Sequence, residues 1–230
     1  ASNLTYIATV NITDIPLPDP ILLGKKIFNS ASEPNLTTDN WISCATCHFD
    51  GGMDTRTWLG FPDGPRNTPA LFGVAHTLPI HWSGDLDELQ DVEITIRDIQ
   101  FGTGLVPGES HDSLGLSHAG LSPELDALTL YLASLKVKSS PHSDDHVAIG
   151  RGEAVFNTAK CVTCHTPPIY TDQQLHDVGT GDASVEKNSH GHGTYFDTPS
   201  LLGIWATAPY FHDGSATTLL SVFESRNSNN

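Results

Sequence analysis

Basic side chains are scarce in this sequence of 230 residues. It holds 11 lysines and arginines against 27 aspartates and glutamates, which gives a formal net charge of -16 at pH 7. Such a surface repels the phosphates of nucleic acids and of anionic lipids, so we expect no nucleic-acid partner. The charge suits a small cationic protein, a metal ion or an extracellular setting, although acidic surfaces most often serve solubility.

Long hydrophobic runs are also missing. No segment approaches the roughly 18 to 20 consecutive apolar residues that a membrane span requires, and no basic segment followed by an apolar one marks an export signal. We therefore expect no membrane span. The opening residues, Ala1-Ser2-Asn3, resemble the start of a mature chain or of a fragment.

Only four cysteines occur, and all of them lie in two CxxCH motifs. The first motif is Cys44-Ala45-Thr46-Cys47-His48, and the second is Cys161-Val162-Thr163-Cys164-His165. Zinc sites usually bring two CxxC pairs within about 15 to 20 residues, whereas a whole predicted domain separates these two. A thioredoxin-like dithiol needs a strand and a helix around it, and the sequence predicts neither.

CxxCH is typical of covalent attachment of a c-type haem. Each cysteine binds one vinyl group, and the histidine becomes the proximal ligand of the iron. The sequence thus predicts two c-type haems, held by Cys44, Cys47 and His48 and by Cys161, Cys164 and His165. Because haem is attached to such motifs outside the cytoplasmic membrane, we expect a periplasmic or extracellular protein whose export signal is not part of this sequence.

The two motifs lie in similar halves of the chain. Each follows an apolar segment with helical spacing, at 21–28 and at 147–155, and each precedes a Thr-Pro pair and a Gly-containing turn, within 68–84 and 198–214. We predict an all-α fold of two tandem cytochrome c-like domains. The first half spans 1–137, the linker 138–145 and the second half 146–230.

A capped helix is predicted near the end of the first half. Ser122-Pro123-Glu124 is a favourable start, and leucines continue at helical spacing to about residue 136. The second half has an apolar segment at 219–223 but no counterpart of this helix. We therefore expect the second domain to be incomplete at its C-terminal end, with the chain continuing beyond Asn230.

The sequence does not determine which residues are the sixth ligands of the two haem irons. Met53 is the only methionine, and it follows His48 too closely for the chain to reach the opposite face of the haem, so we interpret it as a packing residue. The His190-Gly191-His192-Gly193 run resembles a metal-binding loop, although an ordinary polar loop is the simpler interpretation. The candidate sixth ligands are the histidines His76, His81, His190, His192 and His212.

Several motifs resemble the bacterial di-haem cytochrome c peroxidase and MauG superfamily. They are Leu-Gly-x-x-x-Phe at 23–28, Gly-Pro-Arg-Asn-Thr-Pro at 64–69, Trp-Ser-Gly at 82–84 and, most specifically, the segment 198–219. The resemblance covers nearly the whole chain. The residues Ile7-Ala8-Thr9-Val10 also resemble the last strand of a YVTN β-propeller, to which such di-haem modules are often fused.

This resemblance implies two helical domains whose haems face a shared interface. Peroxide would meet the N-terminal haem, and the C-terminal haem would supply an electron. Trp82 would relay electrons between them, although ordinary aromatic packing explains a tryptophan equally well. Calcium would bind at the interface through Asn67, with backbone carbonyls near Thr198.

The sequence departs from the peroxidase pattern at three places. The stretch 56–63 lacks the histidine that precedes Gly-Pro-Arg-Asn in peroxidases, and the proton-moving glutamine and glutamate align near Val92 and Gly102. The expected ligand of the second haem aligns near 225–227, where no side chain binds iron well. Three residues close to these positions have side chains that could move protons, namely Gln90, Glu93 and Gln100. The alignment does not match any of them to the catalytic positions, so the catalytic residues stay unassigned.

Two functions therefore compete. The first is di-haem electron transfer outside the cytoplasm, with a redox protein as donor or acceptor. In this hypothesis the protein could form an oligomer or be part of a larger assembly. The alternative is an enzyme, a di-haem peroxidase or MauG-like oxidase that reduces hydrogen peroxide at the first haem with electrons from a cytochrome or copper protein. A third hypothesis, a structural or sensing module, uses the haems only to hold small domains together.

Overall fold

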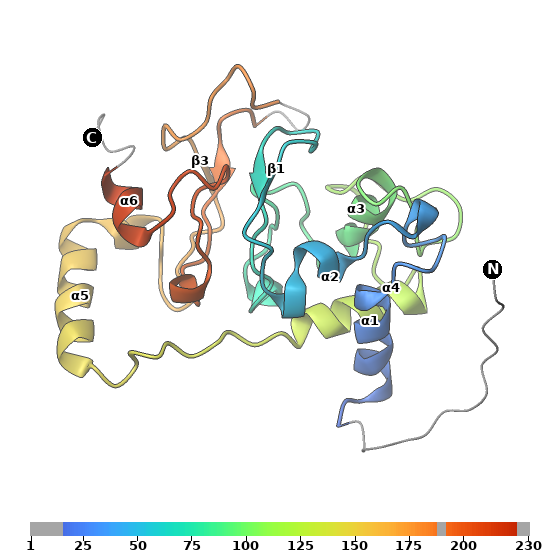
Figure 1. The fold of residues 1–230 in the computed structure, drawn as a ribbon, viewed down its shortest axis with the longest axis horizontal. Helices are drawn as coiled ribbons and strands as arrows, with labels where there is room; N and C mark the ends of the chain where they lie inside the picture. Colours follow the sequence, from blue (N-terminus) through green and yellow to red (C-terminus); the bar gives the residue numbers. More distant parts are fainter. Residues whose placement is uncertain (1–15, 188–191, 225–230) are drawn as a thin grey trace, which may run out of the picture.

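The computed structural model describes residues 16–187 and 192–224 (Figure 1). It is rich in helix, as predicted, but it also has a few short strands. The helices are α1 (Asp19–Asn29), α2 (Cys44–Cys47), α3 (Val92–Asp98), α4 (Pro123–Ala133), α5 (His146–Thr158) and α6 (Leu219–Glu224). The strands, none of which the sequence predicted, are β1 (Thr57–Trp58), β2 (Arg66–Asn67), β3 (Leu175–His176) and β4 (Phe196–Asp197). No helix within the two described ranges is long and apolar enough to cross a membrane.

Helices α1 and α4 form the centre of the first half. The Ser122 hydroxyl accepts a hydrogen bond from the backbone N–H of Leu125 (3.3 Å), which confirms the predicted start of α4. Gly24 lets the two helices approach closely, because a Cβ there would lie 1.9 Å from the carbonyl oxygen of Ala127. Around this contact lies a hydrophobic core that includes Ile27, Phe28, Leu36, Val74, Leu89, Ile96, Leu105, Val106, Leu125, Leu128, Tyr131 and Leu132.

Helix α5 is the corresponding first helix of the second half, and it begins where the sequence predicts. The Asp145 carboxylate caps it by accepting from the N–H of Ala148 (2.9 Å). None of its residues is buried, and the apolar side chains of Val147 and Val155 are 71% and 66% exposed. In Figure 1, α5 stands apart from α1 and α4. Within the described residues, the buried hydrophobic side chains of the second half are Phe196 and Ala216.

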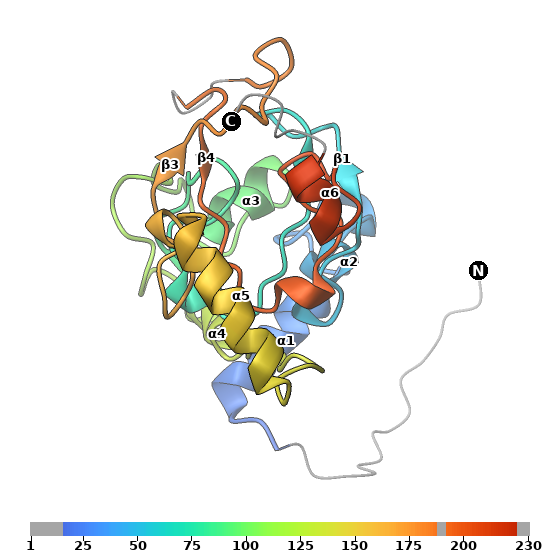
Figure 2. The same cartoon turned by 90° about the vertical axis from the view of Figure 1, so that its left-hand side faces the viewer.

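The internal repeat is visible in the backbone outside the helices. β1 and β2 form an antiparallel pair in the first half, and β3 and β4 form its counterpart in the second. Figure 2 shows β3 and β4 next to each other. Each pair is followed by a glycine in left-handed conformation, Gly73 (φ 76°) and Gly203 (φ 73°), that starts a 3-10 turn. The loops that follow are closed by two equivalent bridges, Ile80 to Leu86 and Tyr210 to Ala216. These matches agree with the similarity of the two halves that the sequence indicates.

The two halves exchange equivalent backbone hydrogen bonds. The N–H of Asn67 in β2 donates to the carbonyl oxygen of His212, and the N–H of Asp197 in β4 donates to the carbonyl oxygen of Trp82 (2.9 Å). The connection between α4 and α5 runs in an extended path along one side of the molecule, and the indole N–H of Trp205 donates to the carbonyl of Lys138 on it (3.4 Å).

Some predicted features lie outside the described residues. They are the strand-like segment 7–10, His190 and the segment 225–227.

Candidate functional site

The first CxxCH motif forms a single helical turn. Helix α2 holds both cysteines, and reciprocal contacts between Ser43 and Thr46 fix its start: the N–H of Ser43 donates to the Thr46 hydroxyl (3.1 Å), and the N–H of Thr46 to the carbonyl of Ser43 (3.0 Å). The N–H of His48 donates to the carbonyl of Cys44 (2.9 Å). Both thiols and the imidazole therefore belong to one compact turn.

The ring of His48 is oriented by its own hydrogen bond. Its Nδ1 lies 3.0 Å from the carbonyl oxygen of Pro69. A carbonyl oxygen can only accept, so Nδ1 carries the proton and donates, and Nε2 keeps its lone pair for a metal. Burial lowers the pKa of His48 to about 4, so the ring is neutral at neutral pH. His48 is thus prepared to ligate iron.

The second motif has the same design in a different setting. Cys161 begins a 3-10 turn (Cys161–Thr163), and the N–H of His165 donates to the Cys161 carbonyl (2.9 Å). The Nδ1 of His165 lies 3.1 Å from the carbonyl oxygen of Tyr170, which selects the same tautomer as in His48. The two proximal histidines therefore use the same chemistry with different backbone partners.

The four cysteines form no disulfide. Burial raises the pKa of Cys44 and of Cys47 to about 11, with the charge of Asp54 adding to the effect at Cys47. Burial also raises the pKa of Cys164. Two free thiols beside an imidazole whose Nδ1 donates to a backbone carbonyl are the donor set that a c-type haem requires, so both motifs fit this cofactor.

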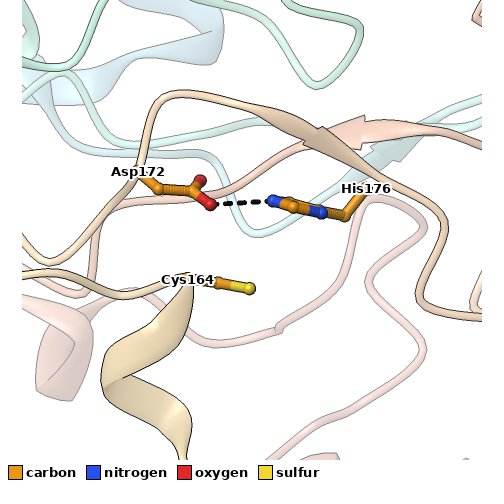
Figure 3. A group of neighbouring side chains, drawn as sticks. All are labelled: Cys164, Asp172 and His176. Atoms are coloured by element: carbon orange, nitrogen blue, oxygen red, sulfur yellow. Dashed lines mark hydrogen bonds and ion pairs between the residues drawn. The ribbon is translucent and has the colours of Figure 1, made fainter.

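A group beside the second motif was not singled out by the sequence. Cys164, Asp172 and His176 place their ligand atoms within 4.8 Å of one another, and Asp172 Oδ2 lies 2.8 Å from His176 Nε2 (Figure 3). The trio has metal-ligating side chains, but the thiol is protonated and belongs to CxxCH. We therefore interpret Asp172 and His176 as a pair at the edge of the second haem site. The spacing of four residues between Asp172 and His176 was the signal present in the sequence. Such a spacing brings side chains together in a helix, but these two residues do not lie in a helix.

Trp82 lies where the two halves of the chain meet. Its indole N–H donates to the carbonyl of Asn67 (2.8 Å), and its ring meets that of His212 edge-on, with centroids 6.4 Å apart. Its own carbonyl accepts from Asp197 of the second half. Trp82 is thus held by the backbone of both halves, in a position that either a relay or a packing residue would occupy.

A buried polar network surrounds this junction. Glu186, whose side chain is 1% exposed, accepts from Arg66 Nη1 (2.6 Å) and contacts His212 Nε2 (2.8 Å). Phe196 stacks on the His212 ring, with centroids 4.0 Å apart. Since the Nε2 of His212 already contacts the Glu186 carboxylate, ligation of iron through that atom would break this hydrogen bond. Glu186 lies in a polar loop without any motif, and sequence reasoning did not find it.

The remaining candidate ligands are scattered. His76 is exposed at the end of a 3-10 turn (Val74–His76), and His192 is half-buried. The Nδ1 of His81 contacts Asp85 (3.0 Å), and His81 lies close enough to His48 to help lower the pKa of that ring. Within the described residues, His81 is thus the candidate associated with the first haem site.

Of the three candidate proton-moving residues, only Gln100 contacts a motif. Its side-chain Nε2 lies 3.8 Å from the sulfur of Cys44. Glu93 is completely buried, and its carboxylate accepts from Arg97 Nε (2.7 Å) and from two backbone N–H groups, which gives it a structural role. Gln90 donates to Asp126 (3.3 Å).

Comparisons with known proteins agree with this geometry. Residues 18–105 match the family model of di-haem cytochrome c peroxidases, and residues 195–229 match a model described as RoxA-like, cytochrome c-like. The methylamine utilization protein MauG of Methylorubrum extorquens is 26% identical over an alignment covering 90% of this chain and 68% of that protein. The chain therefore resembles the di-haem cytochrome c peroxidase and MauG family over most of its length. The two c-type haems of that family agree with the two CxxCH motifs of this chain.

Other proteins extend the comparison. The hydrazine synthase subunit gamma of Kuenenia stuttgartiensis is 26% identical over 86% of this chain and 67% of its own length. A solved structure of hydrazine synthase from that organism superimposes with a TM-score of 0.68 at 21% identity, covering 98% of this chain and 91% of the other. A MauG-like protein associated with microbial copper homeostasis gives a TM-score of 0.64, also at 21% identity, and covers 94% and 76%. These structures share the fold.

Proposed function

We propose that the chain is a di-haem c-type cytochrome that transfers electrons outside the cytoplasm, with a redox protein as its partner. One haem would be held by Cys44, Cys47 and His48, and the other by Cys161, Cys164 and His165. The haems supply a reversible one-electron store at each site. The protein orients the proximal histidines and fixes the spacing of the two sites.

The observation that best supports this function is the matched pair of proximal histidines, together with one tryptophan that both halves hold in place. His48 and His165 both direct Nδ1 at a carbonyl oxygen, at 3.0 and 3.1 Å. Trp82 is bonded to both halves through its indole and its carbonyl. Electron transfer needs this fixed geometry and no acid–base group, and the carboxylate of Glu93 is already occupied by Arg97 and by two backbone N–H groups.

Replacing Trp82 with phenylalanine tests the relay. We expect the rate of electron transfer between the haems to fall by about tenfold, which corresponds to about 1.4 kcal/mol in the barrier, because phenylalanine is much harder to oxidise. Flash photolysis of the half-reduced protein measures this rate. Trp58→Phe is the matched control, since its indole N–H donates to Asp54 (2.9 Å) within the first half. An unchanged rate in Trp82→Phe would identify Trp82 as a packing residue.

Reduction of hydrogen peroxide at the first haem is the second candidate function. The buried carboxamide of Gln100 beside Cys44 favours it, because an amide can orient a bound peroxide by hydrogen bonding. Several relatives are named cytochrome c peroxidases, including Ccp of Escherichia coli at 26% identity over 86% of this chain and 51% of that protein. Stopped-flow mixing of the reduced protein with peroxide separates the functions, since a pure electron carrier gives no rapid change in the haem spectrum.

We also propose a calcium ion at Asn67. Its Oδ1 is buried without a hydrogen-bond partner among the described residues, while its Nδ2 contacts the carbonyl oxygen of Pro209 (2.7 Å). Turning the amide over would direct two oxygens at one cation, and calcium prefers such oxygen ligands. The carbonyl of Thr198 accepts from the Thr171 hydroxyl (2.6 Å), so Pro209 is the more available donor.

Removal of calcium with a chelator is expected to lower the melting temperature of the protein. Calcium present at about 100 times its dissociation constant should raise the free energy of unfolding by about 2.7 kcal/mol. Differential scanning calorimetry with and without chelator measures the shift. Asn67→Ala should abolish it, whereas Asn29→Ala, at an exposed helix end, should leave it unchanged. A shift that persists in Asn67→Ala would place the ion elsewhere.

A further inference from the structure

A pair of aromatic side chains is exposed on the surface of the first half. Trp41 is 50% exposed and Phe101 is 62% exposed, and their rings stack with centroids 6.4 Å apart and planes inclined by 28°. The two residues come from distant parts of the chain. Single exposed aromatic residues are common, but a stacked pair kept at the surface leaves a large apolar area in water.

The backbone of Phe101 is strained to reach this position. Its φ of 57° lies in the left-handed region, which costs a non-glycine residue about 1–2 kcal/mol. The carbonyl of Phe101 accepts from the Thr38 hydroxyl, and the carbonyl of Gln100 accepts from the N–H of Thr38 (3.3 Å). The next residue is confined too, because a Cβ at Gly102 would lie 2.5 Å from the carbonyl oxygen of Asn35. Strain that is held from several sides often marks a functional position.

A single buried residue connects this pair to the first CxxCH motif. The indole N–H of Trp41 donates to the backbone carbonyl of Gln100 (3.3 Å), and the side chain of Gln100 reaches the sulfur of Cys44 (3.8 Å). Gln100 is 6% exposed. The exposed indole is therefore two short contacts from a thiol that is expected to bond the haem.

We propose that Trp41, stacked on Phe101, is an oxidisable relay residue that passes electrons from a positively charged one-electron donor at the surface to the first haem site. The proposal rests on the second candidate function, the reduction of hydrogen peroxide at a haem held by Cys44 and Cys47, and hydrogen peroxide is the oxidant. The charge of the donor follows from the net charge of -16 and from the exposed carboxylates of Asp39 and Asp98, which flank the two aromatic residues in sequence.

The electrons and protons of this route balance. Cleavage of the O–O bond of one hydrogen peroxide to give two waters takes two electrons and two protons, and the protons come from solvent. One electron at a time leaves the Trp41 indole for the oxidised first haem site. No bond forms or breaks at Trp41, because its N–H proton stays in the hydrogen bond to the Gln100 carbonyl. An electron from the donor then restores the indole.

The test compares the holoprotein with Trp41→Phe, which keeps the stacked ring but removes the easily oxidised indole. Trp205→Phe is the matched control, because Trp205 is 43% exposed and its indole N–H also donates to a backbone carbonyl, that of Lys138. Peroxide is first added without donor, and oxidised tryptophan is located by peptide mass spectrometry. We expect oxidation at Trp41 to exceed that at Trp205 by about tenfold.

Turnover with hexaammineruthenium(II), a cationic one-electron probe, gives the second measurement. We expect Trp41→Phe to lower the peroxide-dependent oxidation of this probe by about tenfold, Trp205→Phe to leave it unchanged, and added salt to slow the wild-type reaction. Equal oxidation of the two tryptophans, or unchanged turnover in Trp41→Phe, overturns the relay.

Failure of the proposed function is recognised separately. A wild-type protein without two haems by the pyridine haemochrome assay contradicts the proposed attachment and the relay together. A wild-type protein that carries both haems and reacts with peroxide, but shows no preference for Trp41, contradicts the relay alone.

Discussion

Replacing Cys161 and Cys164 with serine is expected to halve the haem content and to unfold the second half of the chain. Among the described residues of that half, the buried hydrophobic side chains are Phe196 and Ala216, so its own core is too small to hold it folded. A covalent haem would supply the missing apolar volume. The pyridine haemochrome assay measures haem content, and hydrogen exchange measures the loss of protection in α5.

The corresponding change in the first motif provides the control. Replacing Cys44 and Cys47 with serine should also remove one haem, but α1 and α4 should keep their protection, because they pack on each other through Phe28, Leu125 and Leu128. The difference between the two double variants is the informative result. Equal loss of protection in both halves would mean that the first core depends on its haem as strongly as the second half does.

Replacing Glu186 with alanine should lower the free energy of unfolding by about 3–5 kcal/mol, because it leaves a buried positive charge without its partner. The side chain of Arg66 is 9% exposed and that of Glu186 is 1% exposed, so solvent cannot replace the lost contact. His212 Nε2 loses its partner in the same variant. Urea denaturation monitored by tryptophan fluorescence measures the loss.

Two further variants make this result specific. Glu153→Ala, an exposed glutamate on α5, should change the free energy of unfolding by less than about 0.5 kcal/mol. Glu186→Gln keeps hydrogen-bonding groups near Arg66 and His212 while removing the negative charge, so we expect a loss between those of the two alanine variants. A loss in Glu186→Ala no larger than that in Glu153→Ala would show that Arg66 is satisfied without its carboxylate.

The sequence predicted the features that depend on neighbours along the chain. Ser122 and Asp145 cap helices because their side chains bond backbone groups three residues away. The spacing in CxxCH brings thiols and imidazole into one turn for the same local reason. The repeat was visible because duplication preserves the order of glycines and prolines that fix the turns.

Features that depend on contacts between distant segments were not predicted. The strands contain two residues each, which is too few for an alternating pattern. Glu186 acquires its role only when the second half folds against Arg66. Glu93 lies in the right stretch of sequence for a proton-moving group, but Arg97 one turn later and the backbone of Leu105 occupy its carboxylate.

The reciprocal bonds from Asn67 to His212 and from Asp197 to Trp82 have a consequence for how such a protein can diverge. Both bonds join main-chain atoms, which every amino acid except proline supplies as donors. Surface side chains of either half can therefore be substituted during evolution, which would change the proposed redox partner. The distance between the two proposed haem sites would stay constant. In a protein of two similar halves, these backbone hydrogen bonds would preserve the arrangement of the two proposed haem sites, while surface residues could change to suit another redox partner.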